Sequence, residues 1–411
     1  MAMVTLGCSE TKEDVDQKVT TYYGDVQSIL DHRCTRCHNE SELGTGDFTK
    51  VDVVETMADL ILDAVESGRM PPPASDPECR DYVDSDIMTI PDSDKAVIAK
   101  WIAEGKARGI KPEGDPIISK EPKIENPDLE VRIQEPFSPD FDRPNNPGND
   151  YRCFALEHGR TEPFYITAMH PIIDNPEIVH HVVLAKADSE GILPGSDDPN
   201  GVGCIGGGGA FIDDFRNGFM LGGWAPGMDV VEFEENTGLL IQPDDYIVIQ
   251  VHYFQRPELG EVADQSGYAF KIKEQVDTVI QMLPLGPRNF TIPAGAEAHT
   301  EQWSFQSPVG MRIWGSFPHM HILGSGYEFS IERNGAQNCL ARSDDFDFEN
   351  QLTYMFKDPF VLEAGDKFKM SCTWNNSTSN ENLIHNPPID IGQGERTDEE
   401  MCFSFTLTSF N

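Results

Sequence analysis

The chain has 411 residues, 25% of them charged and 38% hydrophobic, and 70 acidic against 31 basic residues give it a formal net charge of -39. This acidic surplus argues against a nucleic-acid partner and is typical of a solvated protein surface. No apolar run approaches the roughly 18 residues of a membrane-spanning helix, and the length is that of about two or three domains.

The first residues, MAMVTLGCSE, form a short N-terminal tail that we assign to residues 1–14. The string TLGC is similar to the end of a lipoprotein signal, so Cys8 is a candidate lipid-bearing residue, with an incidental cysteine as the alternative. The chain has nine cysteines. Those outside residues 34–38 lack zinc-type spacing, which indicates disulfides in an oxidising compartment.

Residues 15–108 are predicted to be helical. Apolar side chains recur there at intervals of three and four residues, which places them on one helix face: Val53, Met57, Leu60, Ile61 and Ala64. A second helix is predicted after Pro91, with Ser93 as its cap.

Within this region, residues 34–38 read CTRCH. In a CxxCH motif both thiols form thioethers with haem and the adjacent histidine ligates the iron. The motif therefore predicts one covalent haem c, attached at Cys34 and Cys37 and ligated by His38.

The predicted sixth ligand of the haem iron is Met70, in SGRMPPP, because three prolines make a rigid loop; Met57 and Met88 are the alternatives. The pattern resembles small class I cytochromes c over residues 15–108. That resemblance implies an all-α cytochrome c domain used for electron transfer.

Residues 109–150 are rich in proline and are predicted to form a semi-stiff linker. Short strand patterns follow to the end of the chain. The segment YIVIQVHYF, residues 246–254, alternates between two faces in the manner of a strand. We expect two antiparallel β domains of sandwich type, at residues 151–285 and 286–411.

Two histidine pairs lie in this β region. His319 and His321 are two residues apart, so on a strand both imidazoles project from one face and could share a metal. His180 and His181 are neighbours, which converge only if the strand twists or ends there. For His252, an ordinary core histidine is the plain alternative.

Five segments resemble, in order, the copper type II, ascorbate-dependent monooxygenases: PEIVHHVVL, GGWAPGMDVVEFEENTG, IQVHYF, FPHMHILG and GERTDEEMCFSF. The resemblance covers about residues 151–411 and implies two all-β jelly-roll domains with one copper ion each. Together with the helical region, it implies a multidomain chain, a small all-α cytochrome c domain followed by two jelly rolls.

The resemblance also assigns ligands. It implies a first copper site for electron transfer, made of three histidines: His180, His181 and His252. It implies a second, catalytic copper site where O2 reacts: His319, His321 and Met401. A thioether favours Cu(I), which suits a site that meets O2. Without the resemblance, Met401 would be interpreted as a packing methionine.

Disulfide pairings follow from the same resemblance. It implies two bridges, one around the first histidine pair and one beside the methionine: Cys153–Cys204 and Cys372–Cys402. Cys79 and Cys339 remain, and a bridge between them would tie the haem-binding region to the β region.

Two departures from the family bear on function. Phe317 stands two residues before the HMH motif, where peptide-acting members carry an arginine that binds the substrate carboxylate, so a more apolar or amine substrate is expected. The second departure is the haem-binding CTRCH motif.

We expect a bacterial extracytoplasmic monooxygenase, periplasmic or lipid-anchored at the outer membrane. Its expected partners are O2, a small organic substrate and a periplasmic donor or ascorbate-like reductant.

Two alternatives remain. One is a non-enzymatic redox or copper-binding protein on the same fold. The other is a zinc hydrolase, which Met401 argues against because zinc rarely recruits a thioether.

Overall fold

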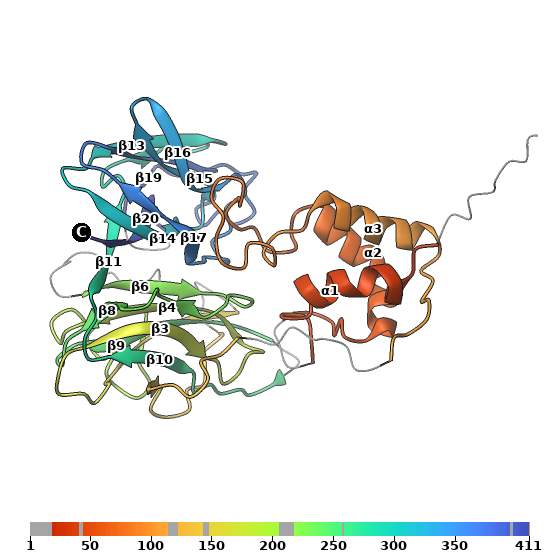
Figure 1. The fold of residues 1–411 in the computed structure, drawn as a ribbon, viewed down its shortest axis with the longest axis horizontal. Helices are drawn as coiled ribbons and strands as arrows, with labels where there is room; N and C mark the ends of the chain where they lie inside the picture. The colour runs from red at the N-terminus through yellow and green to blue at the C-terminus, as the bar shows by residue number, and fades with distance from the viewer. Residues whose placement is uncertain are drawn as a thin grey trace, which may run out of the picture.

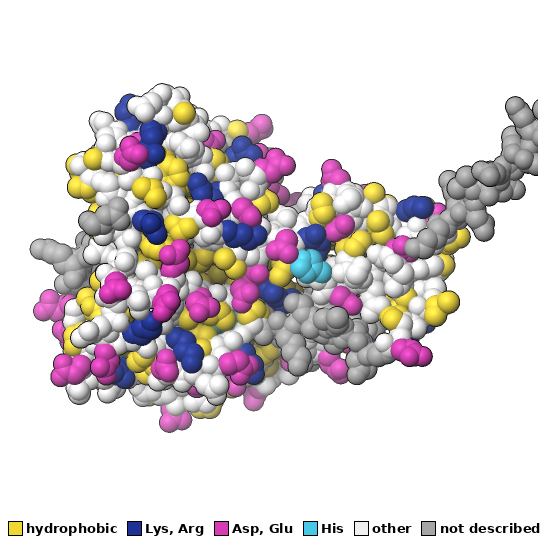
Figure 2. Space-filling view, in the orientation of Figure 1, with side chains coloured by type: hydrophobic (Ala, Val, Ile, Leu, Met, Phe, Trp, Pro, Cys, Tyr) yellow, Lys and Arg dark blue, Asp and Glu magenta, His cyan; other side chains and the backbone are white. Residues whose placement is uncertain are grey.

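The computed structural model describes residues 19–40, 44–113, 122–142, 148–204, 218–256, 259–394 and 398–410. Figure 1 shows a helical part at one end of the molecule and β-sheet layers at the other. We call residues 122–277 the N-terminal β unit and residues 278–410 the C-terminal β unit. Figure 2 shows acidic side chains spread over this face of the molecule, in keeping with its net charge.

The helical part contains a π-helical turn and three α-helices: η1 (Tyr22–Val26), α1 (Gln27–Arg33), α2 (Val51–Glu66) and α3 (Asp92–Ala103). One face of α2 is buried at amphipathic spacing: Val54, Ala58, Ile61 and Val65. The predicted face was wrong except for Ile61, and Leu60 is 65% exposed. These helices enclose a small core of their own, in which Trp101 is 1% exposed. Ser93 lies inside α3 and does not cap it; the N-cap position is Pro91.

The predicted fold class is wrong, because the chain is mostly β and contains no all-α cytochrome c domain among the described residues. The α-helices have only 7, 16 and 12 residues. Residues 67–91, between α2 and α3, form turns rather than helix, and they pack on the C-terminal β unit. Tyr82 and Met88 are buried in the β core rather than in the helical one. This segment is rich in proline and aspartate, which disfavour helix.

The described residues of the β units form four sheets. A five-stranded sheet has the spatial order β5 (Val202–Gly203), β2 (Asn149–Leu156), β9 (Tyr246–Phe254), β4 (Val179–Ala187) and β6 (Gly218–Trp224). A four-stranded sheet has the order β13 (His299–Gln306), β18 (Lys367–Trp374), β15 (Gly324–Arg333) and β16 (Ala336–Ser343). A two-stranded sheet joins β12 (Thr291–Ile292) and β19 (Ile391–Gly392).

The fourth sheet has nine strands and runs through both units. Its order is β1 (Leu129–Arg132), β10 (Gly267–Lys273), β3 (Phe164–Ile172), β8 (Thr237–Ile241), β11 (Thr278–Leu285), β20 (Phe403–Ser409), β14 (Met311–His319) and β17 (Tyr354–Leu362), with β7 (Val231–Glu232) beside β3. Strand β11 joins the two parts of this sheet, because it pairs in parallel with β8 and antiparallel with β20. The two units therefore share a sheet.

Part of the expected linker belongs to the N-terminal β unit. Strand β1 lies within residues 109–150 and pairs with β10. Ile133 and Phe137, just after it, are 1% and 5% exposed. Apolar side chains between the prolines therefore dock this segment onto the sheet.

Three disulfides join described residues, which confirms the expectation of disulfides: Cys79–Cys339, Cys153–Cys204 and Cys372–Cys402. Such bridges persist in oxidising compartments, so the chain is of a secreted or extracellular type. None of the described helices combines the length and the apolar character needed to cross a bilayer.

The Cys79–Cys339 bridge fastens the segment after α2 to β16. Around it, the Ser75 amide donates to the Tyr354 hydroxyl at 2.9 Å and the Asp76 amide donates to the Arg342 carbonyl at 2.7 Å. Because the bridge closes a loop with a sequence separation of 260, replacing both cysteines by serine is expected to lower the free energy of unfolding by about 2–5 kcal/mol. Urea denaturation measures the loss, and an unchanged midpoint would contradict it.

Candidate functional site

The first histidine group lies on the five-stranded sheet. His180 and His181 belong to β4, and His252 belongs to the adjacent β9, where it is paired with His181. The register between the two strands shifts between Val179 and His181. This irregularity lets neighbouring side chains converge, as a regular strand would not.

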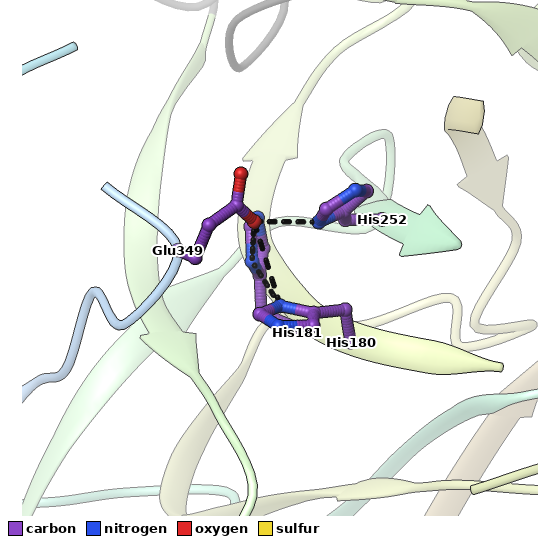
Figure 3. A group of neighbouring side chains, drawn as sticks. All are labelled: His180, His181, His252 and Glu349. Atoms are coloured by element: carbon purple, nitrogen blue, oxygen red, sulfur yellow. Dashed lines mark hydrogen bonds and ion pairs between the residues drawn. The ribbon is translucent and has the colours of Figure 1, made fainter. Parts of the chain in front are cut away.

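Figure 3 shows the three imidazoles pointing toward one carboxylate, that of Glu349. Glu349 Oε2 lies 3.1 Å from His252 Nδ1, 3.5 Å from His180 Nδ1 and 3.9 Å from His181 Nδ1. The donor atoms of the four residues all lie within 4.8 Å of one another. This group could hold a metal ion.

One aromatic and one polar neighbour hold the His252 ring in place. Tyr151 stacks on it with ring centroids 4.0 Å apart and planes 3° from parallel. Its Nε2 lies 2.8 Å from Asn149 Oδ1. This contact turns Nδ1 toward Glu349, and both His252 Nδ1 and Glu349 Oε2 are buried without a well-formed hydrogen bond. Orphaned buried atoms of this kind, facing each other, fit a missing cation.

The charge states at this group suit metal binding. Burial, followed by the charge of His252, lowers the pKa of His180 to about 4, and burial lowers that of His181 well below its usual value. Burial alone would raise the pKa of Glu349, but its interactions with the three histidines, His252 first, lower it to about 2. At neutral pH His180 and His181 are therefore neutral and Glu349 is ionised, the forms in which these groups ligate metals.

The second histidine group lies at the end of β14. His319 is the last residue of the strand and pairs with Phe403 of β20, while His321 follows in a turn. The two rings have centroids 5.1 Å apart. Met401, two residues before Phe403, is 0% exposed. The structure thus brings His319, His321 and the Met401 segment together.

Hydrogen bonds orient both rings of this second group. His319 Nδ1 lies 2.5 Å from Gln351 Oε1, and His321 Nδ1 lies 3.0 Å from the Glu399 carbonyl oxygen. Burial, followed by the charge of His321, lowers the pKa of His319 to about 3. Because both imidazoles are bonded through Nδ1, they resemble metal-binding histidines whose other nitrogen faces the metal.

A buried carboxylate supports the same site. Glu400 accepts hydrogen bonds from the amides of His321 at 3.0 Å and Met401 at 3.2 Å, and from Trp374 Nε1 at 2.9 Å. Its burial raises its pKa to about 8, opposed by these hydrogen bonds. Glu400 therefore holds the backbone of two predicted ligands in one network.

The two groups are connected by residues that the sequence analysis did not identify. Glu349 and Gln351 both lie between β16 and β17, one at each histidine group. Between them, Asn350 Nδ2 donates to the Pro73 carbonyl, 2.8 Å away, in the segment after α2. These three residues match no motif, and only the fold brings them to the histidines.

The CTRCH motif lies against the N-terminal β unit. Arg36 NH1 donates to the Gly227 carbonyl at 2.8 Å and pairs with Asp84 at 3.2 Å. A Cβ on Gly227, which has φ +97, would lie 3.1 Å from Cys37 Sγ. Cys34 and Cys37 take part in none of the three disulfides.

His38 is held in a defined orientation. Its Nδ1 lies 3.0 Å from the Thr45 carbonyl oxygen, and its ring stacks on Phe48 with centroids 4.4 Å apart. Burial lowers its pKa. A contact through Nδ1 is the arrangement found in histidines that ligate a metal through Nε2, so the role of His38 as a ligand stays a prediction. Met70 lies in the turn after α2 and is 40% exposed, so its role as a ligand stays a prediction. Cys8 lies outside the described residues.

Comparisons with known proteins agree with the site. Residues 282–407 match the model described as "Copper type II ascorbate-dependent monooxygenase, C-terminal domain". Dopamine beta-hydroxylase of Canis lupus familiaris is 25% identical over 203 residues, which are 45% of this chain and 31% of that protein. DBH-like monooxygenase protein 1 of Homo sapiens is 24% identical over 272 residues, 60% of this chain and 42% of that protein.

Residues 282–407 are thus similar to the C-terminal domain of the copper type II ascorbate-dependent monooxygenases. The two relatives that match over longer stretches are a hydroxylase and a monooxygenase by name. The chain spans less than half the length of these two relatives. Among solved structures, the infectious bursal disease virus VP2 subviral particle is 8% identical, with 70% of this chain and 74% of that chain covered, and its TM-score of 0.19 supports no argument.

Proposed function

We propose that the chain is a bacterial, extracytoplasmic copper monooxygenase that hydroxylates a C–H bond of a small organic substrate with O2. The observation that supports this most is the placement of the two histidine groups. They stand on neighbouring sheets, and one segment, residues 349–351, contacts both. The similarity of residues 282–407 to copper-dependent monooxygenases suggests the reaction class.

Two copper ions would be held by the residues that the family resemblance indicates. The first set comprises three histidines: His180, His181 and His252. The second set adds a thioether: His319, His321 and Met401. Copper at these residues would supply one-electron redox chemistry and the reaction with O2. The donor sets fit copper, because neutral imidazoles suit both oxidation states and a thioether suits Cu(I).

The chain's own contribution at the second set is orientation. Gln351 and the Glu399 carbonyl fix the two rings, and Glu400 fixes the backbone of His321 and Met401. The Cys372–Cys402 disulfide anchors the residue next to Met401 to β18. A site held this firmly keeps its geometry through a reaction cycle.

The substrate is expected to be apolar or an amine. Phe317, where peptide-acting family members carry an arginine, is 0% exposed and packs near Phe405, with ring centroids 6.0 Å apart. A Cβ on Gly223 would lie 2.8 Å from the Phe317 ring. A buried aromatic ring wedged between the two units supplies no charge for a substrate carboxylate.

Electrons would arrive through a haem c attached to Cys34 and Cys37, with His38 and Met70 as iron ligands, in a haem-binding unit at residues 15–108. Hydroxylation consumes two electrons per O2. The contacts of Arg36 and Cys37 with Gly227 support this route, because β6 ends three residues earlier at Trp224, which pairs with Val182 beside His181. A periplasmic donor or an ascorbate-like reductant would reduce the haem, and Cys8 would carry a lipid anchor at the outer membrane.

Copper analysis combined with O2 uptake tests the function. The wild-type protein is expected to bind two copper ions and to consume O2 with ascorbate and a small amine or apolar substrate. His181→Ala and His319→Ala are each expected to bind one copper ion and to lose O2 uptake. Two bound copper ions with no O2 uptake across a broad substrate panel would instead favour the non-enzymatic redox protein, and zinc in place of copper would favour a hydrolase.

A further inference from the structure

Glu349 reaches the first histidine group from the other β unit. The three histidines belong to the N-terminal β unit, whereas Glu349 lies in the C-terminal unit between β16 and β17. Its side chain is 42% exposed overall, yet its Oε2 atom is buried among the three Nδ1 atoms. The Tyr151 hydroxyl donates to the other carboxylate oxygen, Oε1, at 3.5 Å.

We propose that Glu349 is a fourth ligand of the metal bound by His180, His181 and His252. This inference rests on the proposed metal site at these histidines and adds a residue to it. The donor atoms of all four residues lie within 4.8 Å of one another, so an ion between them could bind every one. Among the described residues, the ion-pair partners of the Glu349 carboxylate are these three imidazoles.

The carboxylate changes the chemistry expected of the site. Three neutral imidazoles serve Cu(I) and Cu(II) alike, whereas an anionic oxygen donor favours the harder, more highly charged Cu(II). Glu349 therefore stabilises the oxidised ion, opposite to the effect of the Met401 thioether at the second site. The two sites would differ in reduction potential because of these two residues.

The position of Glu349 also joins the units. A metal bound by β4 and β9 residues on one side and by Glu349 on the other holds residues 344–353 against the N-terminal sheet. Thr353 adds a second contact, with its Oγ1 accepting from the Gly223 amide at 3.0 Å. Metal binding is thus expected to reduce the opening of this segment.

The test compares Glu349→Gln with the parent protein, both carrying His321→Ala to weaken the second site. Cu(II) affinity, measured by chelator competition, is expected to fall at least about tenfold in Glu349→Gln, as is usual when a metal-site residue is lost, while Cu(I) affinity changes little. A tenfold change in this ratio raises the one-electron potential by about 59 mV. The Cu(II) electron paramagnetic resonance spectrum is expected to change.

Glu363→Gln is the matched control, because Glu363 is 69% exposed and lies in the same unit; it should match the parent. Hydrogen exchange of residues 344–353 should slow with copper in the parent and not in Glu349→Gln. Equal Cu(II) affinity and identical spectra in the parent and Glu349→Gln would overturn the fourth ligand and leave the proposed function standing. Failure of the parent itself to bind copper would overturn both.

Discussion

Met401→Leu is expected to reduce copper-dependent O2 consumption by at least about 100-fold, beyond the range typical of residues that only support a metal site. The substitution removes the thioether while keeping a buried apolar side chain of similar volume, a change that usually costs less than about 1.5 kcal/mol of stability. Leucine is preferred to alanine because Met401 is 0% exposed. An alanine substitution would also remove packing, and that loss would obscure the effect of removing the thioether.

The measurement is O2 uptake by copper-loaded protein, with Cu(I) affinity at the second site as an independent readout. Met370→Leu is a suitable control, because Met370 is 2% exposed in β18 of the same unit. Met370 is not one of the proposed copper ligands. The Met370→Leu variant should retain activity. Met401→Leu with full activity would contradict the assignment of Met401 as a ligand.

The double variant Cys34→Ser, Cys37→Ser is expected to lose covalent haem completely, because both thioether bonds require these thiols. In the wild-type protein, covalently attached haem should stay with the polypeptide after denaturation and keep its absorption bands. The double variant should lack these bands. Both histidine groups lie on sheets outside the helical part, so copper binding should remain at two ions per chain. Cys8→Ser is the control and should keep the haem.

The wild-type protein and its His181→Ala variant test electron supply. When Cu(II) is added without O2 to the reduced wild-type protein, the haem bands are expected to shift to the oxidised form as copper binds, and the shift should weaken in His181→Ala. Bands that stay reduced while copper binds would contradict electron transfer from this haem to the copper site. Covalent haem in the double serine variant would contradict the attachment residues.

Motifs in the sequence located the histidine groups because each is a short local pattern. The HMH spacing needs only a strand end to bring two rings together, and that is how β14 finishes. The convergence of His180 and His181 could be stated only as a condition, because the register shift in β4 arises from its pairing with β9. A shift of this kind depends on two strands about 70 residues apart and has no local signature.

The helical region shows why the fold class was wrong. Periodicity predicted the existence of α2 but not its buried face, because Ile61 is the one predicted residue that is buried there and Leu60 is 65% exposed. Residues 67–91 carry no such period, and the burial of Tyr82 depends on a distant segment, as the Tyr82–Phe356 bridge shows. Glu349 and Gln351 escaped prediction for the same reason, because their partners lie in other elements.

The adjacency of Glu349, Asn350 and Gln351 has a thermodynamic consequence. One short stretch of backbone touches the first histidine group, the turn after Met70 and the second histidine group in consecutive residues. If occupancy of one group shifts this backbone, linkage requires that occupancy of the other shift it in return by the same free energy. Binding at these three regions would then be coupled. Occupancy of any one region would change the binding affinity at the other two.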